Sequence, residues 1–227
     1  MTAVELNLRQ TLSQAATQMG LPLTDAQTAT LLAYMALIEK WNKVYNLTAV
    51  RDAPAMLTHH LLDSLAVIAP LQSQLQALRS VASDASRPVR LLDVGSGAGL
   101  PGVVIAILCP EIQVDCVDTV AKKASFIQQV ALSLKLPNLR GVHARVENLT
   151  DTYQVISSRA FASLVDFTSW SVHALAEQGV WMAMKGKHPA DEMAALPATV
   201  SVFHVEQLDV PGLGAERCIV WMRSAGG

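Results

Sequence analysis

The sequence lacks the long hydrophobic run that a membrane span or a signal peptide needs. Its apolar stretches, such as Val103–Cys109, fall well short of the roughly 20 residues that cross a bilayer. The first residues carry Glu5 and Arg9 within an amphipathic pattern, which is not typical of a signal peptide. We therefore expect a cytoplasmic protein that has no membrane partner.

Cysteine is also scarce. The 227 residues include three cysteines, Cys109, Cys116 and Cys218, and no CxxC pair. This number and spacing argue against a disulfide framework and against a structural zinc site. We expect buried thiols that behave as small hydrophobic side chains, and no bound metal.

Neither sign of charge is in excess. Lys and Arg number 17 and Asp and Glu 19, which gives a formal net charge of −2. Nucleic-acid-binding proteins usually carry a basic surplus, so such a function would need a local basic patch here. Apolar residues, in contrast, make up 51% of the chain, which excludes disorder as its main state.

Two hydrophobic patterns divide the chain. Residues 1–80 show apolar side chains at helical spacing, with a capping box at Thr24 and Gln27 and a third helix predicted from about Pro54. A small and polar connection follows at 80–88. We predict an N-terminal helical segment, 1–80, packed on a compact domain that spans 88–227.

In the second part, short apolar runs alternate with helical segments. The expected strands are 89–94, 114–117, 139–144, 153–157, 180–185, 200–208 and 218–222, and the expected helices are 101–108, 121–136 and 164–175. Such alternation predicts an α/β fold with a mainly parallel sheet and helices on both faces.

The most informative segment is Asp93-Val-Gly-Ser-Gly-Ala-Gly-Leu-Pro-Gly102, directly after the first predicted strand. Its glycines allow a sharp turn and the close approach of a ligand at the start of a helix. Gly97–Gly102 satisfies the GxGxxG pattern of dinucleotide sites. Asp93, two residues before Gly95, instead resembles the first motif of class I S-adenosylmethionine methyltransferases. Asp118, about 20 residues beyond the turn, suits ribose hydroxyls in either case, or a helix cap.

Further strings carry a resemblance to one family. They are Trp41-Asn-Lys-Val-Tyr-Asn-Leu-Thr48, His60-Leu-Leu-Asp63-Ser-Leu65, Arg145-Val-Glu147, Ser158-Arg-Ala-Phe-Ala162 and Lys185-Gly186. With the glycine turn, they resemble the RsmG (GidB) family of bacterial 16S ribosomal RNA guanine-N7 methyltransferases, from about residue 30 to the C-terminus. The resemblance implies a class I methyltransferase Rossmann-like fold, S-adenosyl-L-methionine as cofactor, and 16S ribosomal RNA or the small ribosomal subunit as partner. We expect a monomer.

The turn and the resemblance together indicate a set of cofactor-binding residues, namely Asp93, Gly95, Gly97, Leu100, Asp118, Val146, Glu147 and Arg159. Val146 and Glu147 would lie at the adenine end or the ribose. Arg159 suits a carboxylate or phosphate. Without the resemblance, Glu147 would be explained as a solvated acid and Arg159 as a structural ion pair.

The target atom that the resemblance implies is N7 of guanine, an unprotonated ring nitrogen. Its lone pair can attack a sulfonium methyl directly, so we expect no catalytic base and no nucleophile. The enzyme would align the reacting atoms and exclude water. The segment Ser157–Ala160 accords with this, because it lacks the Asp/Asn-Pro-Pro-Tyr motif of exocyclic-amine methyltransferases.

RNA contacts are expected from basic residues near the ligand edge of the sheet, namely Lys122, Lys123, Arg145, Lys185 and Lys187. His60 and Asp63, at i,i+3 spacing, are explained equally well by a structural hydrogen bond. Two other functions stay open. Gly97–Gly102 allows an NAD-linked oxidoreductase, although no tyrosine is followed four residues later by lysine. A non-catalytic ribosome-associated module is the third.

Overall fold

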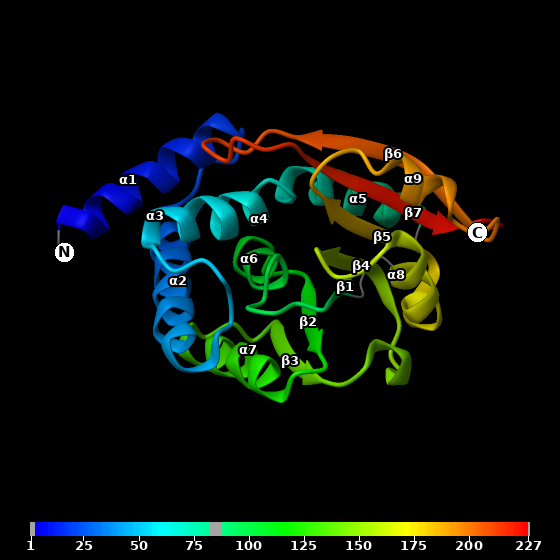
Figure 1. Ribbon diagram of the computed structural model, residues 1–227, viewed down its shortest axis with the longest axis horizontal. Coiled ribbons are helices and arrows are strands. Elements are labelled where there is room, and N and C mark those ends of the chain that lie inside the picture. Colours follow the sequence, from blue (N-terminus) through cyan, green and yellow to red (C-terminus); the bar gives the residue numbers. More distant parts are fainter. Residues whose placement is uncertain (1–2, 82–87, 227) are drawn as a thin grey trace.

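The computed structural model describes residues 3–81 and 88–226, and it confirms the expected α/β architecture. One seven-stranded sheet has the order β3-β2-β1-β4-β5-β7-β6 (Figure 1). Strands β1 to β5 are parallel, and β7 is antiparallel to both β5 and β6. The strands are β1 (Arg90–Val94), β2 (Gln113–Asp118), β3 (Leu139–His143), β4 (Tyr153–Arg159), β5 (Leu175–Lys185), β6 (Val200–Leu208) and β7 (Arg217–Ser224).

Helices cover both faces of this sheet. In the second part of the chain they are α6 (Gly102–Leu108), α7 (Ala121–Ser133), α8 (Leu164–Ser171) and α9 (Ala190–Ala194), with 3-10 turns η2 (Val146–Asn148) and η3 (Val172–Ala174). The N-terminal helices are α1 (Ala3–Gln18), α2 (Asp25–Tyr45), α3 (Ala53–Met56), α4 (Asp63–Leu65) and α5 (Ile68–Val81). Among the described helices, none combines the length and hydrophobicity that a membrane crossing needs.

Several element bounds differ from the expected ones. Helix α7 ends at Ser133, and the chain then turns with Lys135 at a φ of 53°. Strand β5 begins at Leu175, where the sequence pattern predicts a helix. Helix α9 is not foreseen at all, because none of its residues is buried and it has no apolar stripe. The predicted connection at 80–88 lies mostly outside the described residues.

Alternating strand side chains build a separate core on each face. On one face, Leu91 and Val155 join a large cluster with α2, α5, α6 and α7. On the other, Leu92 and Ile156 join a smaller cluster with α8. All three cysteines are buried and free, as expected. The sheet is therefore covered by two helical layers on the first face and one on the second.

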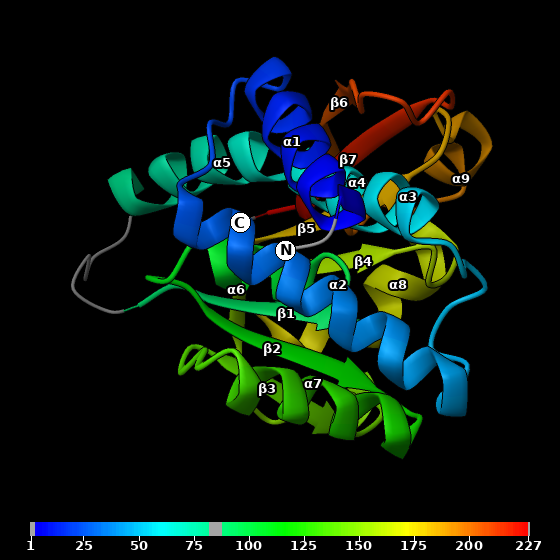
Figure 2. The ribbon, with the colours of Figure 1, turned by 90° about the vertical axis from the view of Figure 1, so that its left-hand side faces the viewer.

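The N-terminal helices supply the outer layer on the first face. Helix α2 begins at the predicted capping box of Thr24 and Gln27, contacts α6 and α7, and crosses in front of β1 and β2 (Figure 2). Its fully buried Tyr34 donates a hydrogen bond to the carbonyl oxygen of Ala98, at 2.6 Å. Helix and sheet thus share one core, and the division at 80–88 into two units stays a prediction.

The third predicted helix is not regular. Between α3 and α4 the chain forms a π-helical turn, η1 (Leu57–Leu62). π-Helical turns are rare and often occur at functional sites. This one brings His60 and Asp63 into the interior, where their side chains face the carboxyl ends of the parallel strands.

Candidate cofactor and RNA site

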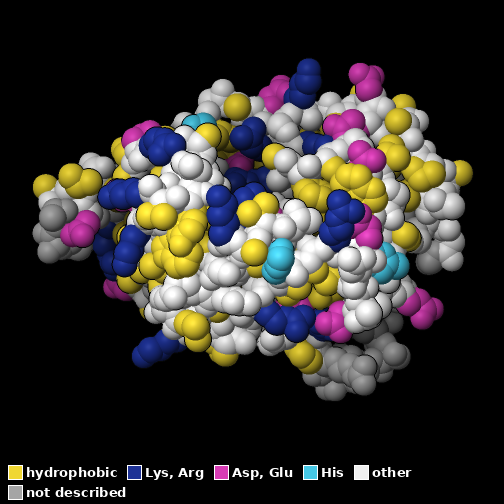
Figure 3. Space-filling model, turned by 60° about the horizontal axis from the view of Figure 1, so that its bottom comes forward, with side chains coloured by type: hydrophobic (Ala, Val, Ile, Leu, Met, Phe, Trp, Pro, Cys, Tyr) yellow, Lys and Arg dark blue, Asp and Glu magenta, His cyan; other side chains and the backbone are white. Residues whose placement is uncertain are grey.

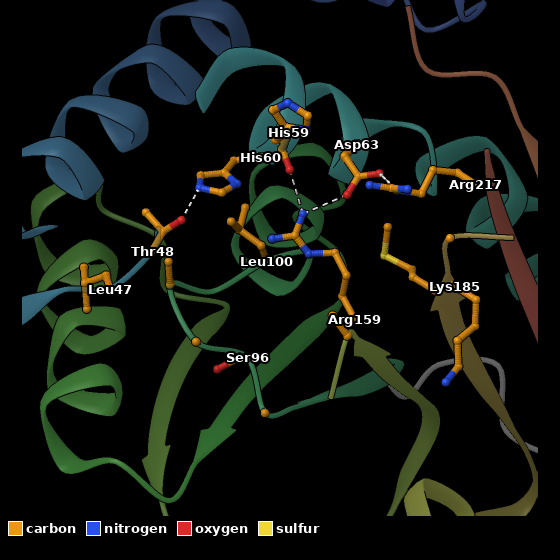
Figure 4. A pocket seen from close by; sticks show the side chains of 16 residues that line it. Leu47, Thr48, His59, His60, Asp63, Ser96, Leu100, Arg159, Lys185 and Arg217 are labelled. Carbon is orange, nitrogen blue, oxygen red and sulfur yellow. Dashed lines mark hydrogen bonds and ion pairs between the residues drawn. The ribbon is translucent and has the colours of Figure 1, made fainter. Parts of the chain in front are cut away.

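A pocket of about 380 Å³ lies at the carboxyl ends of β1, β4 and β5. The glycine turn after β1 forms one side, and Arg159, Lys185 and Arg217 form another (Figure 4). Residues of η1 and α4 close the pocket from above. The order of the sheet reverses between β1 and β4, and ligands of doubly wound folds bind at such a position.

The glycine turn has the backbone conformation that its sequence predicts. Gly95, Gly97 and Gly99 have φ angles of 65°, 59° and 90°, which strongly favour glycine. A Cβ at Gly99 would lie 2.5 Å from carbon atoms of Ile127 and Val103, so the turn packs tightly on its inner side. A Cβ at Gly97 would meet nothing nearer than the Gly95 oxygen, 4.0 Å away. The turn is therefore open to a ligand at Gly97, whereas the ring of Phe161 packs directly on Gly95.

Asp93 supports this turn from beneath. Its side chain is fully buried and accepts hydrogen bonds from the Gly102 N–H and from Ser157 Oγ, both at 2.9 Å. Burial raises the pKa of Asp93 to about 6. The carboxylate thus caps the first N–H of α6, and it does not line the pocket. Asp93 can therefore affect a bound ligand only by maintaining the conformation of the glycine turn.

Asp118 joins the glycine turn to the end of β2. One carboxylate oxygen accepts from the Gly97 N–H at 3.1 Å, and the other accepts from the Val120 N–H at 2.9 Å. The N-cap of α7 is Val120, so Asp118 is not an ordinary helix cap. Asp118 is buried and does not line the pocket, and Lys123 Nζ lies 3.5 Å from it, although a carboxylate has more lone pairs than these contacts use.

Val146 and Glu147 lie in η2, after β3, and do not line the pocket. Val146 is buried in the core of the second face, and Glu147 is exposed. The loop that leads to them is tied to β2, because the Ala144 N–H donates to the Asp118 carbonyl oxygen at 3.3 Å. The ends of β2 and β3 are therefore adjacent, as an adenosine-binding edge requires.

Arg159 is held by Asp63, a residue that the sequence predicts only as a partner of His60. Arg159 Nη1 donates to Asp63 Oδ2 at 2.8 Å and to the His59 carbonyl oxygen at 2.9 Å. The other oxygen of Asp63 accepts from Arg217 Nε, also at 2.8 Å. One buried carboxylate, 3% exposed, therefore joins the N-terminal helices to the ends of β4 and β7.

The sequence analysis does not identify Arg217 as a pocket residue. Only the sheet topology places it there: β7 runs antiparallel to β5, so the first residue of β7 lies at the carboxyl edge of the parallel strands. The suggested bond between His60 and Asp63 is wrong. His60 Nε2 instead shares a hydrogen bond of 2.8 Å with Thr48 Oγ1, because the π-helical turn displaces i,i+3 neighbours from a common face. Burial lowers the pKa of His60.

The five lysines and arginines predicted to bind RNA fall into two groups. Lys122, Arg145 and Lys187 are exposed. Lys123 Nζ lies 3.5 Å from Asp118, and Lys185 Nζ donates to both carboxylate oxygens of Glu192 and to the carbonyl oxygen of Ala162. Figure 3 shows Lys and Arg side chains spread over one face of the molecule and within a hollow in it.

The site suits a cofactor that has an amino-acid end and a ribose, and it suits a dinucleotide poorly. A pyrophosphate needs free N–H groups at the turn and at the following helix. Here carboxylates of Asp118 and Asp93 accept from the Gly97 and Gly102 N–H groups, and their negative charge would repel phosphate. Arg159, in contrast, uses only Nη1 in its hydrogen bonds to the described residues, which leaves its Nε and Nη2 edge for a carboxylate.

Solved structures share this fold. A SAM dependent methyltransferase from Aquifex aeolicus superimposes with a TM-score of 0.50 at 14% identity, over 75% of this chain and 94% of the other. TrmN from Thermus thermophilus has a TM-score of 0.50 at 20% identity, over 74% of this chain and 53% of TrmN. The likeness shows the fold alone, which is that of the class I methyltransferases that use S-adenosylmethionine.

Sequence comparison defines the family more narrowly. The family model GidB, described as rRNA small subunit methyltransferase G, matches residues 27–220. Proteins named ribosomal RNA small subunit methyltransferase G are 68% identical in Albidiferax ferrireducens, over 96% of this chain and 98% of the relative, and 64% identical in Polaromonas naphthalenivorans, over 98% and 99%. The chain belongs to the GidB family. It is a methyltransferase, and S-adenosylmethionine is its cofactor.

Proposed function

We propose that this protein methylates N7 of a guanine in 16S ribosomal RNA of the small subunit, by direct attack of N7 on the methyl group and without a general base. The relatives' name supports a small-subunit ribosomal RNA substrate. The observation that supports the choice of N7 is the chemistry of the pocket, whose described wall presents hydrogen-bond donors and positive charge and whose single carboxylate is bound by two arginines.

Three residues of the described pocket, Asp63, His60 and His59, carry a group that could act as a base. Asp63 is the only carboxylate among the described lining residues, and each of its oxygens is bound to an arginine. His60 is buried and its Nε2 is bonded to Thr48, whereas His59 is exposed. A guanine N7 has no proton to lose and so needs none of these groups. An exocyclic amine would need a proton acceptor.

The bound cofactor supplies a methyl group on a positively charged sulfur, which a neutral ring nitrogen can attack. The residues of this chain hold it in place. We assign the carboxylate end to the Nε and Nη2 edge of Arg159, the ribose to Asp118, and the adenine end to Val146 and Glu147. Gly95, Gly97 and Leu100 form the surface against which it lies, and Asp93 maintains that surface.

The remaining assignments concern the RNA. We assign its outer contacts to the exposed residues Lys122, Arg145 and Lys187, which a charged backbone can reach. We infer that the protein acts as a monomer, and that it acts in the cytoplasm, where a small-subunit ribosomal RNA substrate would be found.

The test is methyl transfer from labelled cofactor to small ribosomal subunits that lack the modification. We expect label in 16S ribosomal RNA and strand cleavage at the modified guanine after borohydride and aniline treatment. Arg159→Gln should lower kcat/KM by about 100-fold, equivalent to about 2.7 kcal/mol. Arg223→Gln, at the exposed end of β7, is the matched control and should leave it unchanged. Label in protein, or in RNA without cleavage, would exclude the proposal. A non-catalytic module would transfer no methyl at all.

A further inference from the structure

Arg217 is an arginine of the pocket wall for which the cofactor offers no partner. It begins β7, and its side chain is 24% exposed. Nε donates to Asp63, and Nη1 donates to the carbonyl oxygen of Glu216 at 2.8 Å. Among the described residues, Nη2 has no partner. The guanidinium is thus held at two of its three nitrogens, and Nη2 can still donate to a ligand.

The charges of the wall do not balance. Two guanidinium groups, those of Arg159 and Arg217, share the single carboxylate of Asp63. Lys185, the other cation of the lining, is neutralised by Glu192. One positive charge is therefore left over at the mouth of a partly enclosed pocket, where an anion is bound more strongly than in open water.

Two anions can reach this wall during the reaction. The cofactor has one carboxylate and no phosphate, and Arg159 has a free edge that suits it. Figure 4 places Arg217 on the side of the pocket away from Leu100 and the glycine turn, so the same carboxylate is not expected to serve both arginines. The anionic group that RNA brings is the phosphodiester of its backbone.

Resting on the proposed function, we propose that Arg217 binds a phosphate of the RNA strand next to the target guanine. Gly186, after β5, lies directly beside it, because a Cβ there would be 3.8 Å from Arg217 Nη1. Because glycine has no side chain, nothing from this residue blocks the approach to Arg217, and a nucleotide backbone can come close. A phosphate held there fixes the position of the nucleotide whose base enters the pocket.

The experiment compares Arg217→Gln with wild type in methyl transfer to unmodified small subunits, at several KCl concentrations and constant magnesium. Glutamine removes the charge but can still donate to Asp63. We expect the KM for subunits to rise about tenfold and the slope of log KM against log salt to fall by about one. The dissociation constant of S-adenosylhomocysteine, measured by calorimetry, should stay within twofold, since Arg159 is intact.

Arg223→Gln is the matched control on the same strand, because its side chain is exposed and lies over the ring of Phe203 rather than in the pocket. It should leave both KM and the slope unchanged. If Arg217→Gln unfolds, Arg217→Lys keeps a cation beside Asp63; we expect the wild-type slope with a KM severalfold higher, because lysine lacks the guanidinium fork.

Two results would overturn the proposal. One is a wild-type KM in both Arg217 variants, which would leave Arg217 a purely structural partner of Asp63. The other is a loss of cofactor affinity in Arg217→Gln as large as the rise in KM, which would assign Arg217 to the cofactor. Failure of the wild-type enzyme to methylate subunits is a different result, and it would overturn the proposed function instead.

Discussion

The two edges of the parallel sheet each carry an aspartate between two arginines, and they differ in charge balance. At the amino edge, Asp115 accepts from Arg140 Nε at 2.9 Å, from Arg90 and from the Tyr153 hydroxyl. A second acid, Asp151, accepts from Arg90 at 2.8 Å and from Arg140 at 3.3 Å. The two arginines therefore face two carboxylates, and the network is neutral.

At the carboxyl edge, Asp63 pairs with Arg159 and Arg217, and no second carboxylate lines the described pocket. A structural network stabilises best when its charges are matched. A partly buried cation without a counter-charge lowers the stability of the folded protein unless a ligand supplies that charge. We infer that the amino edge contributes to stability, whereas the carboxyl edge is suited to receive anions.

Asp63→Ala should change both stability and binding more than any other substitution considered below. Removal of this buried carboxylate leaves two guanidinium groups without a counter-charge, and we expect the free energy of unfolding in urea to fall by about 3 kcal/mol. Arg159 and Arg217 would also lose their orientation. Both the cofactor dissociation constant and the KM for small subunits should therefore rise by more than tenfold under conditions where the variant is folded.

Asp115→Ala should have a smaller effect and a different one. Asp151 remains beside both arginines after the change, so we expect a loss of about 1–2 kcal/mol in unfolding free energy. Cofactor affinity and methyl transfer per folded molecule should stay within twofold of wild type. If Asp115→Ala impaired cofactor binding as strongly as Asp63→Ala, the division of roles between the two edges would be wrong.

Sequence reasoning predicts the carboxyl edge in part. The glycine turn, Asp93 and Asp118 follow one another within a single βαβ unit, so local spacing is enough to place them together. The strand pattern also predicts the parallel sheet, because alternating apolar runs and helices leave few other folds.

Long-range pairs are what the sequence does not reveal. Asp63 is separated from Arg159 by 96 residues and from Arg217 by 154, and only the completed topology brings them together. The π-helical turn has no distinct hydrophobic period, so His60 is assigned the wrong partner. From the sequence alone, Lys185 is interpreted as an unpaired cation. Its partner Glu192 lies on α9, and this helix has no apolar stripe from which it could be predicted.

The next prediction compares how the contributions of Asp93 and Asp151 to stability depend on pH. Burial raises the pKa of Asp93 to about 6, above the unfolded value of about 3.9, so the folded state binds the proton more tightly. Stability from this group rises as pH falls from 7 towards 4, and we expect a gain of about 1 kcal/mol between pH 7 and pH 5. Hydrogen bonding to Arg90 lowers the pKa of Asp151, so its contribution is lost only as pH falls below about 4.

Asp93→Asn isolates the buried group. Asparagine is neutral at every pH and can keep an acceptor for the Gly102 N–H. The difference in unfolding free energy between wild type and this variant, measured in urea without cofactor, should change by about 1 kcal/mol from pH 7 to pH 5 in favour of wild type. A difference that is independent of pH would show that the carboxyl group titrates as in the unfolded chain.

Lys185→Gln should produce the smallest effect, and it tests charge balance directly. Lys185 lines the same pocket as Arg217, but its ammonium already donates to Glu192 and to Ala162. A neutralised cation adds little to the attraction of RNA, so the KM for small subunits and its salt slope should stay at wild-type values. The lost ion pair should lower the unfolding free energy by about 0.5 kcal/mol. A tenfold rise in KM, as expected for Arg217→Gln, would mean that Glu192 releases Lys185 when RNA binds, and the positive charge available at this edge would then be larger than the free protein displays.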